Sequence, residues 1–169
     1  MKKTLPFLLI SMTLSLLPST AIAAGTNPYG TSTVDPAGPN EIIFTISKGQ
    51  KSTQFATSRL LKMKATEVSI YEPFLKKRQT FSVIPISTFF AMVGIKGNDL
   101  VTTTALNDYV FKAKASQFLS AQTLVAIKRS GEQIPYDQGG PIRLIFTSKS
   151  TWAKNLDAWN WSLATITVK

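Results

Sequence analysis

A double glycine and a proline lead into an arginine-bearing apolar run near the end of the chain. Gly139, Gly140 and Pro141 precede Arg143, and the run ends at Phe146. Glycines permit positive φ and close backbone approach, and the N–H groups of such a turn can form a small nest for an anion. The planar guanidinium fork of arginine suits phosphate or carboxylate. The segment therefore predicts a site for a small anionic ligand.

Two acidic residues offer a different explanation for this arginine. Arg143 can equally be held for packing, or for pairing with Asp137 or Asp108. Asp108 stands beside Tyr109, which raises the further possibility of an acid–base pair at a cleft. No second positioned carboxylate or base accompanies them, so a hydrolase is a weak interpretation and Asp108 as a turn residue is the simpler one.

Two tryptophans near the C-terminus are the other residues that suit a flat ligand. Trp159 and Trp161 are two positions apart, so on the strand that this segment predicts they share one face. Indole rings can stack on a flat ligand or contact a partner, and they can equally fill a core.

The chain contains neither cysteine nor histidine. The usual zinc, copper and haem ligands are therefore missing, and Ser-His and Cys-His dyads are excluded. We expect no metal site and no disulfide, so stability must come from the hydrophobic core.

The first residues have the pattern of a secretory signal peptide. Lys2 and Lys3 precede an apolar stretch from Leu5 to Leu17, and Ala21-Ile22-Ala23 is a small-x-small cleavage site. The apolar stretch is shorter than a membrane span needs, which argues against an anchor. We expect a signal peptide over residues 1–23, a flexible leader over 24–40 and a single domain over 41–169. The expected location is the periplasm, with no membrane span after cleavage.

The net charge of the chain is +10, and removal of Lys2 and Lys3 (10 minus 2) leaves +8. Such a charge favours acidic partners, or simply a solvated basic surface. The densest basic cluster is in Leu75–Arg78. No nucleic-acid-binding signature accompanies it, and an exported protein rarely meets nucleic acid, so we expect no nucleic-acid partner.

Apolar periodicity predicts mainly strands with two or three short helices. The helices are expected in Thr53–Met63 and from Pro85 to a glycine stop at Gly94. A hairpin is expected over Leu124–Pro135, and a strand over Trp159–Val168 with a bulge near Ala164. Further strands are expected over residues 41–47, 66–72, 79–85 and 141–148, and in two β-rich runs within 98–118. The predicted class is α+β, with mixed, mostly antiparallel sheets.

The order of these pieces resembles the molybdopterin-binding domain of sulfite-oxidase-type oxidoreductases. An aromatic, a valine and a proline precede a helix that ends in glycine, in Thr80–Ile95. Asn107-Asp108-Tyr109 follows as an Asp-Gly-Tyr-like element, then Gly131–Pro135 as a hairpin. The most specific match is Gly139, Pro141, Arg143, Leu144 and Ile145. The resemblance implies that family's fold and, near Arg143, its pterin pocket.

The departures from that family concern its cofactor. The resemblance implies a cysteine thiolate on the molybdenum and cofactor-contacting histidines, and this chain has neither residue. The element at Asp108-Tyr109 lacks the family's central glycine. The leader carries no Arg-Arg pair, whereas the resemblance implies export of a folded, cofactor-loaded protein.

We therefore expect a non-catalytic exported protein that binds a small anionic or flat ligand, or the periplasmic domain of a membrane sensor. The predicted ligand-binding residues are Arg143, Asp108, Tyr109, Gly139, Gly140, Trp159 and Trp161. No cofactor is expected, although the resemblance leaves molybdopterin open. The alternative function is a molybdopterin-dependent oxidoreductase in the periplasm.

Overall fold

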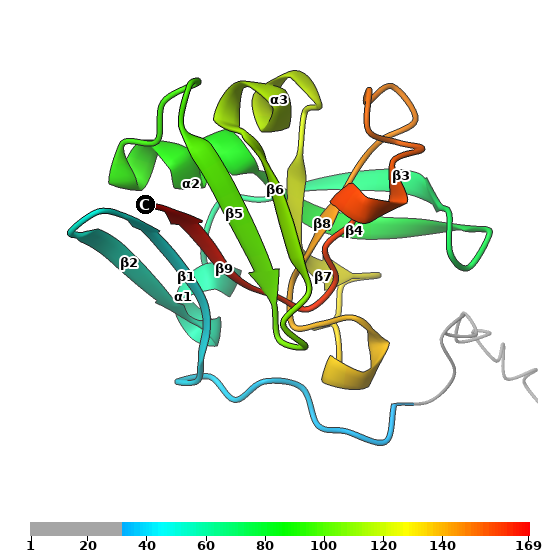
Figure 1. Ribbon diagram of the computed structural model, residues 1–169. Helices are drawn as coiled ribbons and strands as arrows, with labels where there is room; N and C mark the ends of the chain where they lie inside the picture. The colour runs from blue at the N-terminus through cyan, green and yellow to red at the C-terminus, as the bar shows by residue number, and fades with distance from the viewer. Residues whose placement is uncertain (1–31) are drawn as a thin grey trace, which may run out of the picture.

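The computed structural model of the chain describes residues 32–169 (Figure 1). The predicted signal peptide and residues 24–31 of the predicted leader lie outside these residues. The boundaries at 23 and 40 stay predictions. The elements in chain order are β1 (Ile42–Lys48), β2 (Lys51–Ala56), α1 (Thr57–Leu61), β3 (Thr66–Glu72), β4 (Lys77–Pro85), α2 (Ile86–Val93), β5 (Leu100–Ala105), β6 (Val110–Lys114), α3 (Ala115–Ser120), β7 (Leu124–Arg129), the 3-10 helix η1 (Tyr136–Gln138), β8 (Arg143–Ile145), the 3-10 helix η2 (Leu156–Ala158) and β9 (Leu163–Val168).

The strands form two sheets. A five-stranded sheet has the order β2-β1-β9-β5-β6, in which β1 and β9 run parallel and the other neighbours antiparallel. A four-stranded sheet has the order β3-β4-β7-β8 and is antiparallel throughout. The predicted class of mixed, mostly antiparallel sheets with a few short helices is confirmed.

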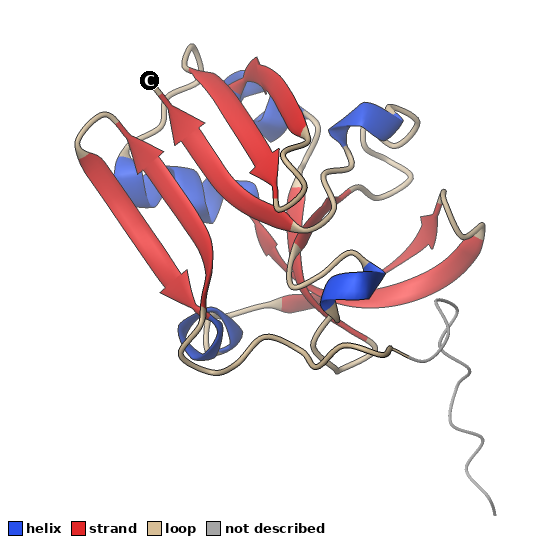
Figure 2. Cartoon of the chain, turned by 60° about the horizontal axis from the view of Figure 1, so that its bottom comes forward, coloured by secondary structure: helices blue, strands red, loops and turns tan. Residues whose placement is uncertain are grey.

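The main core lies between the two sheets and is completed by α2. Figure 2 shows the five-stranded sheet in front with helices behind it. Phe44 of β1, Phe55 of β2 and Phe89 of α2 meet with ring centroids 5.2 to 5.5 Å apart. The helix ends where the sequence predicts, because Gly94 adopts a left-handed conformation with φ 74°. Burial of these aromatic rings packs α2 against the five-stranded sheet.

A second cluster covers the other face of the four-stranded sheet. Its members include Phe81 and Val83 of β4, Ile145 of β8, and Phe146 and Trp159 from the segment after β8. The four-stranded sheet is therefore buried on both sides at β8, where every residue is buried, whereas β3 at the other edge keeps one face exposed. The β3–β4 hairpin extends from this sheet away from the rest of the molecule (Figure 1).

Four local predictions from the sequence are wrong. The helix expected over Thr53–Met63 is shorter, because residues 53–56 belong to β2 and α1 spans only Thr57–Leu61. The tryptophans do not lie on a strand, because β9 begins only at Leu163. The expected hairpin after β7 is reduced to an isolated bridge between Arg129 and Glu132, and β7 pairs with β4 and β8 instead. A helix, α3, replaces the end of the second β-rich run, where the side-chain oxygen of Gln117 accepts the backbone N–H of Lys114.

The bulge expected near Ala164 is confirmed. Thr104 pairs with Thr165, whereas the next residue, Ala105, pairs with Leu163, so Ala164 is the extra residue. The switch in side-chain parity along β9 is the sequence signal of this bulge. Across residues 32–169, no helix reaches the length and apolarity that a membrane crossing requires.

Candidate functional site

Strand register places a row of polar side chains on one face of the four-stranded sheet. Phe81 of β4 pairs with Arg129 of β7, and Ala126 of β7 pairs with Arg143 of β8. Paired residues in antiparallel strands project to the same face, so both arginines lie on the face that carries Phe81. This is the face of the second cluster, and the arginines replace apolar side chains on it.

Arg143 is wholly buried and its guanidinium lies between two aromatic rings. Its terminal carbon is 4.7 Å from the centroid of Phe81 and 4.7 Å from the ring of Trp161. A guanidinium over a ring face is attracted by the ring quadrupole, and the attraction strengthens when water is excluded. The carboxylate of Asp137 accepts hydrogen bonds from the hydroxyl of Ser32 and the backbone N–H of Thr33. Packing between rings, one of the explanations that the sequence left open, is present in the structure.

The double glycine approaches protein atoms closely. Gly139 has φ 80°, and a Cβ there would lie 2.8 Å from the Trp161 ring and 3.2 Å from Nη1 of Arg143. A Cβ on Gly140 would lie 1.9 Å from the carbonyl oxygen of Ile134. The N–H of Gly140 donates to the carbonyl of Pro135 at 2.9 Å, so it is not directed to a ligand as the expected anion nest requires. The glycines instead let the turn pack against Arg143 and Trp161.

Four further buried polar residues belong to this face and were missed from the sequence. A short hydrogen bond runs from Nη2 of Arg129 to the side-chain oxygen of Gln138, at the end of η1. Gln79 and Glu72 are also buried, with exposed fractions of 6% and 0%. Gln79 is two residues before Phe81, and Glu72 two residues after Ile70. The sequence signal that could have identified Gln79 and Glu72 is a polar residue at a position where the strand alternation predicts an apolar, buried one.

The two tryptophans meet through a ring on the β3–β4 hairpin. Phe74 lies 4.9 Å from Trp161 and 6.2 Å from Trp159, edge to face in both cases. Trp159 is also 5.4 Å from Phe146, so it belongs to the core, whereas Trp161 is partly exposed. Phe74, Phe81, Gly139, Arg143 and Trp161 are called the arginine cluster below.

Asp108 and Tyr109 lie in the β5–β6 turn and are not part of the arginine cluster. Asp108 has φ 64° and is exposed, as a turn residue would be. The hydroxyl of Tyr109 donates to the carbonyl of Asp157 at 2.9 Å. Burial, with a contribution from the Asp157 charge, raises the pKa of Tyr109 above its ordinary value. Both residues are exposed, whereas Arg143 is wholly buried.

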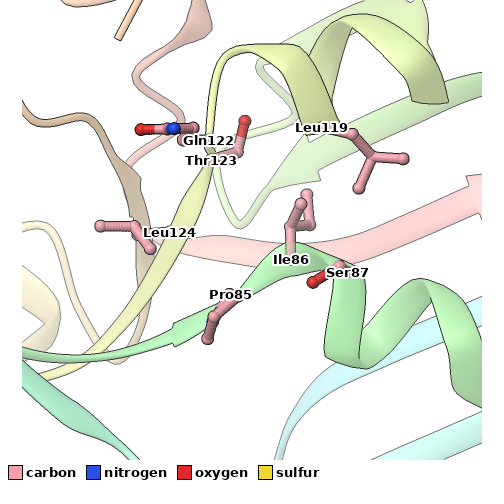
Figure 3. A pocket seen from close by; sticks show the side chains of 7 residues that line it. All are labelled: Pro85, Ile86, Ser87, Leu119, Gln122, Thr123 and Leu124. Carbon is pink, nitrogen blue, oxygen red and sulfur yellow. The ribbon is translucent and has the colours of Figure 1, made fainter. Parts of the chain in front are cut away.

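A cavity of roughly 270 Å³ opens elsewhere, where the start of α2 meets the end of α3 (Figure 3). Ile86 and Leu119 line it together with Thr123, whose hydroxyl donates to the carbonyl of Phe118. None of the lining residues carries a charge, so this cavity does not offer the chemistry that an anion requires. Within the part of the chain that the structure describes, no group of three or more acidic residues is placed to hold a metal ion.

Comparison with known proteins points to one family. The model of the oxidoreductase molybdopterin binding domain matches residues 46–161. The crystal structure of the sulfane dehydrogenase SoxCD from Paracoccus pantotrophus is similar in fold, with a TM-score of 0.59 at 12% identity. The match covers 82% of this chain and 41% of that chain, so this chain spans less than half of the dehydrogenase chain. A search of curated proteins gave no significant match.

Proposed function

Since the chain belongs to the oxidoreductase molybdopterin binding domain family, we propose that it is an exported, non-catalytic member that binds a small anionic or flat ligand at the arginine cluster. The observation that carries the proposal is a buried arginine between aromatic rings in a chain that has no thiol.

The family implies a molybdopterin cofactor, which has a metal centre and an organic, anionic portion. The residues of this chain suit the organic portion and do not suit the metal centre. Without cysteine or histidine, the 169 residues supply neither a thiolate nor an imidazole for a metal. The described residues also contain no acidic group of three or more that takes their place. The metal-bearing part therefore does not fit, and no redox step is assigned to it.

The residues of the arginine cluster suit a flat organic ligand that carries a negative charge. The Arg143 guanidinium matches phosphate or carboxylate, and Arg129 places a second positive charge on the same face of the sheet. The partly exposed ring of Trp161 offers a flat surface beside Arg143. Gly139 lets these two side chains stack beside the turn, since a Cβ there would lie within 3.2 Å of both.

The periplasm is the proposed location, from the signal-peptide pattern over residues 1–23. A non-catalytic binding protein in the periplasm acts through a partner that recognises its ligand-bound form. The outer domain of a membrane sensor is the partner class that we propose for this role.

The first test is the metal and pterin content of protein purified from the periplasm. Elemental mass spectrometry measures molybdenum, and fluorescence after oxidation measures pterin. We expect neither. Near-stoichiometric amounts of both would overturn the proposal in favour of a periplasmic molybdopterin-dependent oxidoreductase.

Binding is tested with inorganic phosphate and benzoate as probes, followed by tryptophan fluorescence. We expect Arg143→Gln to weaken binding on the order of 10-fold or more, as loss of a charge-assisted hydrogen bond implies. Arg59→Gln is the matched control, because Arg59 also lies over a ring, 4.8 Å from the centroid of Phe55, at an exposed position. Near-ultraviolet circular dichroism shows whether each variant is folded. Equal affinity of wild type and Arg143→Gln for the probes would show that Arg143 does not bind the ligand.

A further inference from the structure

We propose that the tip of the β3–β4 hairpin docks the protein on an anionic phospholipid surface. The basic tip is defined by Tyr71, Leu75, Lys76, Lys77 and Arg78. It goes beyond the ligand site, because none of these residues belongs to the arginine cluster. Figure 1 shows the hairpin projecting from the body of the molecule.

Three consecutive cations of the basic tip have no ion-pair partner among the residues that the structure describes. Lys76, Lys77 and Arg78 are all exposed, and the salt bridge found in this part of the chain joins Lys48 to Asp99. Of the two acidic residues of β3, Glu72 next to the turn is wholly buried, and its Oε2 accepts the backbone N–H of Leu75. The exposed Glu67 lies near the other end of the strand. The positive field of the tip is therefore directed outward, towards an acidic partner.

Strand register distributes these cations around the tip. Lys77 pairs with Glu72 and Arg78 pairs with Tyr71, so Lys77 and Arg78 project from opposite faces of the hairpin. Lys76 lies in the turn between the strands with φ 54°. The positive charge thus encircles the end of the hairpin. A seven-pair ladder between β3 and β4 holds that end in place.

Apolar and amphipathic side chains accompany the charge. Tyr71 is 56% exposed and stands opposite Arg78, and Leu75 in the turn is partly exposed. Phe74 in the same turn contacts Trp161 and is assigned to the arginine cluster, although its side chain is also partly exposed. Aromatic and aliphatic groups beside Lys and Arg are the composition that binds the headgroup region of a bilayer, where the stems bury and the charges meet phosphate.

Charge and size favour a lipid surface over a protein partner. A second copy of the chain carries the same net positive charge and is repelled. A stable protein interface buries about 800 Å² on each partner, whereas the end of one hairpin presents a few side chains. A fluid anionic surface needs no such area, since lipids gather around each cation.

The test is sedimentation with phosphatidylcholine vesicles that contain or lack phosphatidylglycerol. The protein is taken from the periplasm, and its intact mass confirms that all variants share one N-terminus. We expect wild type to bind the anionic vesicles, more tightly at low ionic strength. The triple variant Lys76→Gln, Lys77→Gln, Arg78→Gln is expected to bind roughly 100-fold more weakly, from about fivefold for each cation near the surface.

A matched variant separates the tip from general charge. Lys51→Gln, Lys112→Gln, Lys154→Gln lowers the net charge equally at exposed positions outside the hairpin, and we expect a loss of less than about fivefold. An equal loss in both triple variants would overturn the proposal. Failure of the wild-type protein to bind anionic vesicles would also overturn the proposal. Binding of polyglutamate through the tip, without binding to the vesicles, would indicate an acidic protein partner instead. These outcomes do not depend on phosphate or benzoate binding at Arg143.

Discussion

Arg143 shows how a single charged residue can be buried in this fold. Its guanidinium lies between the rings of Phe81 and Trp161 and is completely removed from solvent. Taking a charge out of water costs several kcal/mol, and ring faces offset part of that cost. The same stacking fixes the plane of the guanidinium, and a fixed plane is what two-point recognition of a carboxylate or phosphate requires.

The turn that precedes Arg143 depends on the absence of a side chain at Gly140. We expect Gly140→Ala to lower the free energy of unfolding by about 3 kcal/mol or more, because its Cβ would overlap the Ile134 carbonyl oxygen at 1.9 Å. Urea denaturation followed by tryptophan fluorescence measures the change.

The control for this substitution is a glycine with room around it. A Cβ on Gly97 meets its nearest atom, Cβ of Ser116, at 3.6 Å, and Gly97 does not have positive φ. Gly97→Ala is therefore expected to change the free energy of unfolding by no more than about 0.5 kcal/mol. Similar losses in both variants would show that the close approach at Gly140 is not the cause.

At the scale of elements, the segment before β1 is fastened to η1 by hydrogen bonds. The hydroxyl of Tyr136 donates to the carboxylate of Glu41 in a short hydrogen bond. Asp137 accepts from the hydroxyl of Ser32 at 2.8 Å and from the backbone N–H of Thr33 at 3.1 Å. The part of the predicted leader that the structure describes therefore contacts the domain, and does so next to the turn that supports Arg143.

This contact predicts a pH dependence at the alkaline end. Burial, and then the hydrogen bond to Glu41, raise the pKa of Tyr136 from its ordinary value of 10.0 to about 12. The folded chain therefore holds this proton where the unfolded chain releases it. The stability from Tyr136 is complete below pH 10 and is lost as the pH rises towards about 12. We expect the free energy of unfolding to fall over this window.

Two phenylalanine variants isolate the contribution of Tyr136. Tyr136→Phe removes the titrating hydroxyl, so its free energy of unfolding should fall less steeply than that of wild type over the same window. Tyr71→Phe changes an exposed tyrosine outside the contact and should keep the wild-type slope. Urea denaturation at a series of alkaline pH values gives these slopes. Identical slopes for Tyr136→Phe and wild type would disprove the assignment.

At the scale of the whole molecule, the last strand closes the five-stranded sheet. β9 lies between β1 and β5, so it joins the first hairpin of the described chain to the strands of its middle part. Leu163 and Ile166 of β9 are completely buried in the main core. Because this central strand is the last one along the chain, the sheet depends on contacts between residues that are far apart in sequence.

This position predicts the effect of truncation. A chain that ends at Ser162 lacks β9, and we expect it to show no cooperative thermal unfolding, because β1 and β5 lose their shared neighbour. A chain that ends at Val168 lacks only the exposed Lys169 and should unfold as wild type does. Near-ultraviolet circular dichroism during heating checks both. A folded, cooperative chain without β9 would contradict this account of the sheet.

Local patterns in the sequence determined most of the elements. Alternation of apolar residues predicted β1, β3 and β4, and the glycine stop of α2 was visible at Gly94. The parity switch along β9 predicted the bulge at Ala164. The motif from Gly139 to Ile145 identified the family that the comparison confirmed. These signals are readable because each depends only on residues close in sequence.

The surroundings of the candidate site were decided by tertiary structure alone. Phe81 and Arg129 come from strands that are separate from β8, and strand register brings them to the face of Arg143. Phe74 lies in the β3–β4 turn and meets Trp161. Trp159 and Trp161 were expected on a strand, but the segment bends so that Trp161 covers Arg143 and Trp159 enters the core. The residue types set which chemistry the chain contains, and pairing between distant strands decided which side chains meet, since contacts of long range leave no local pattern.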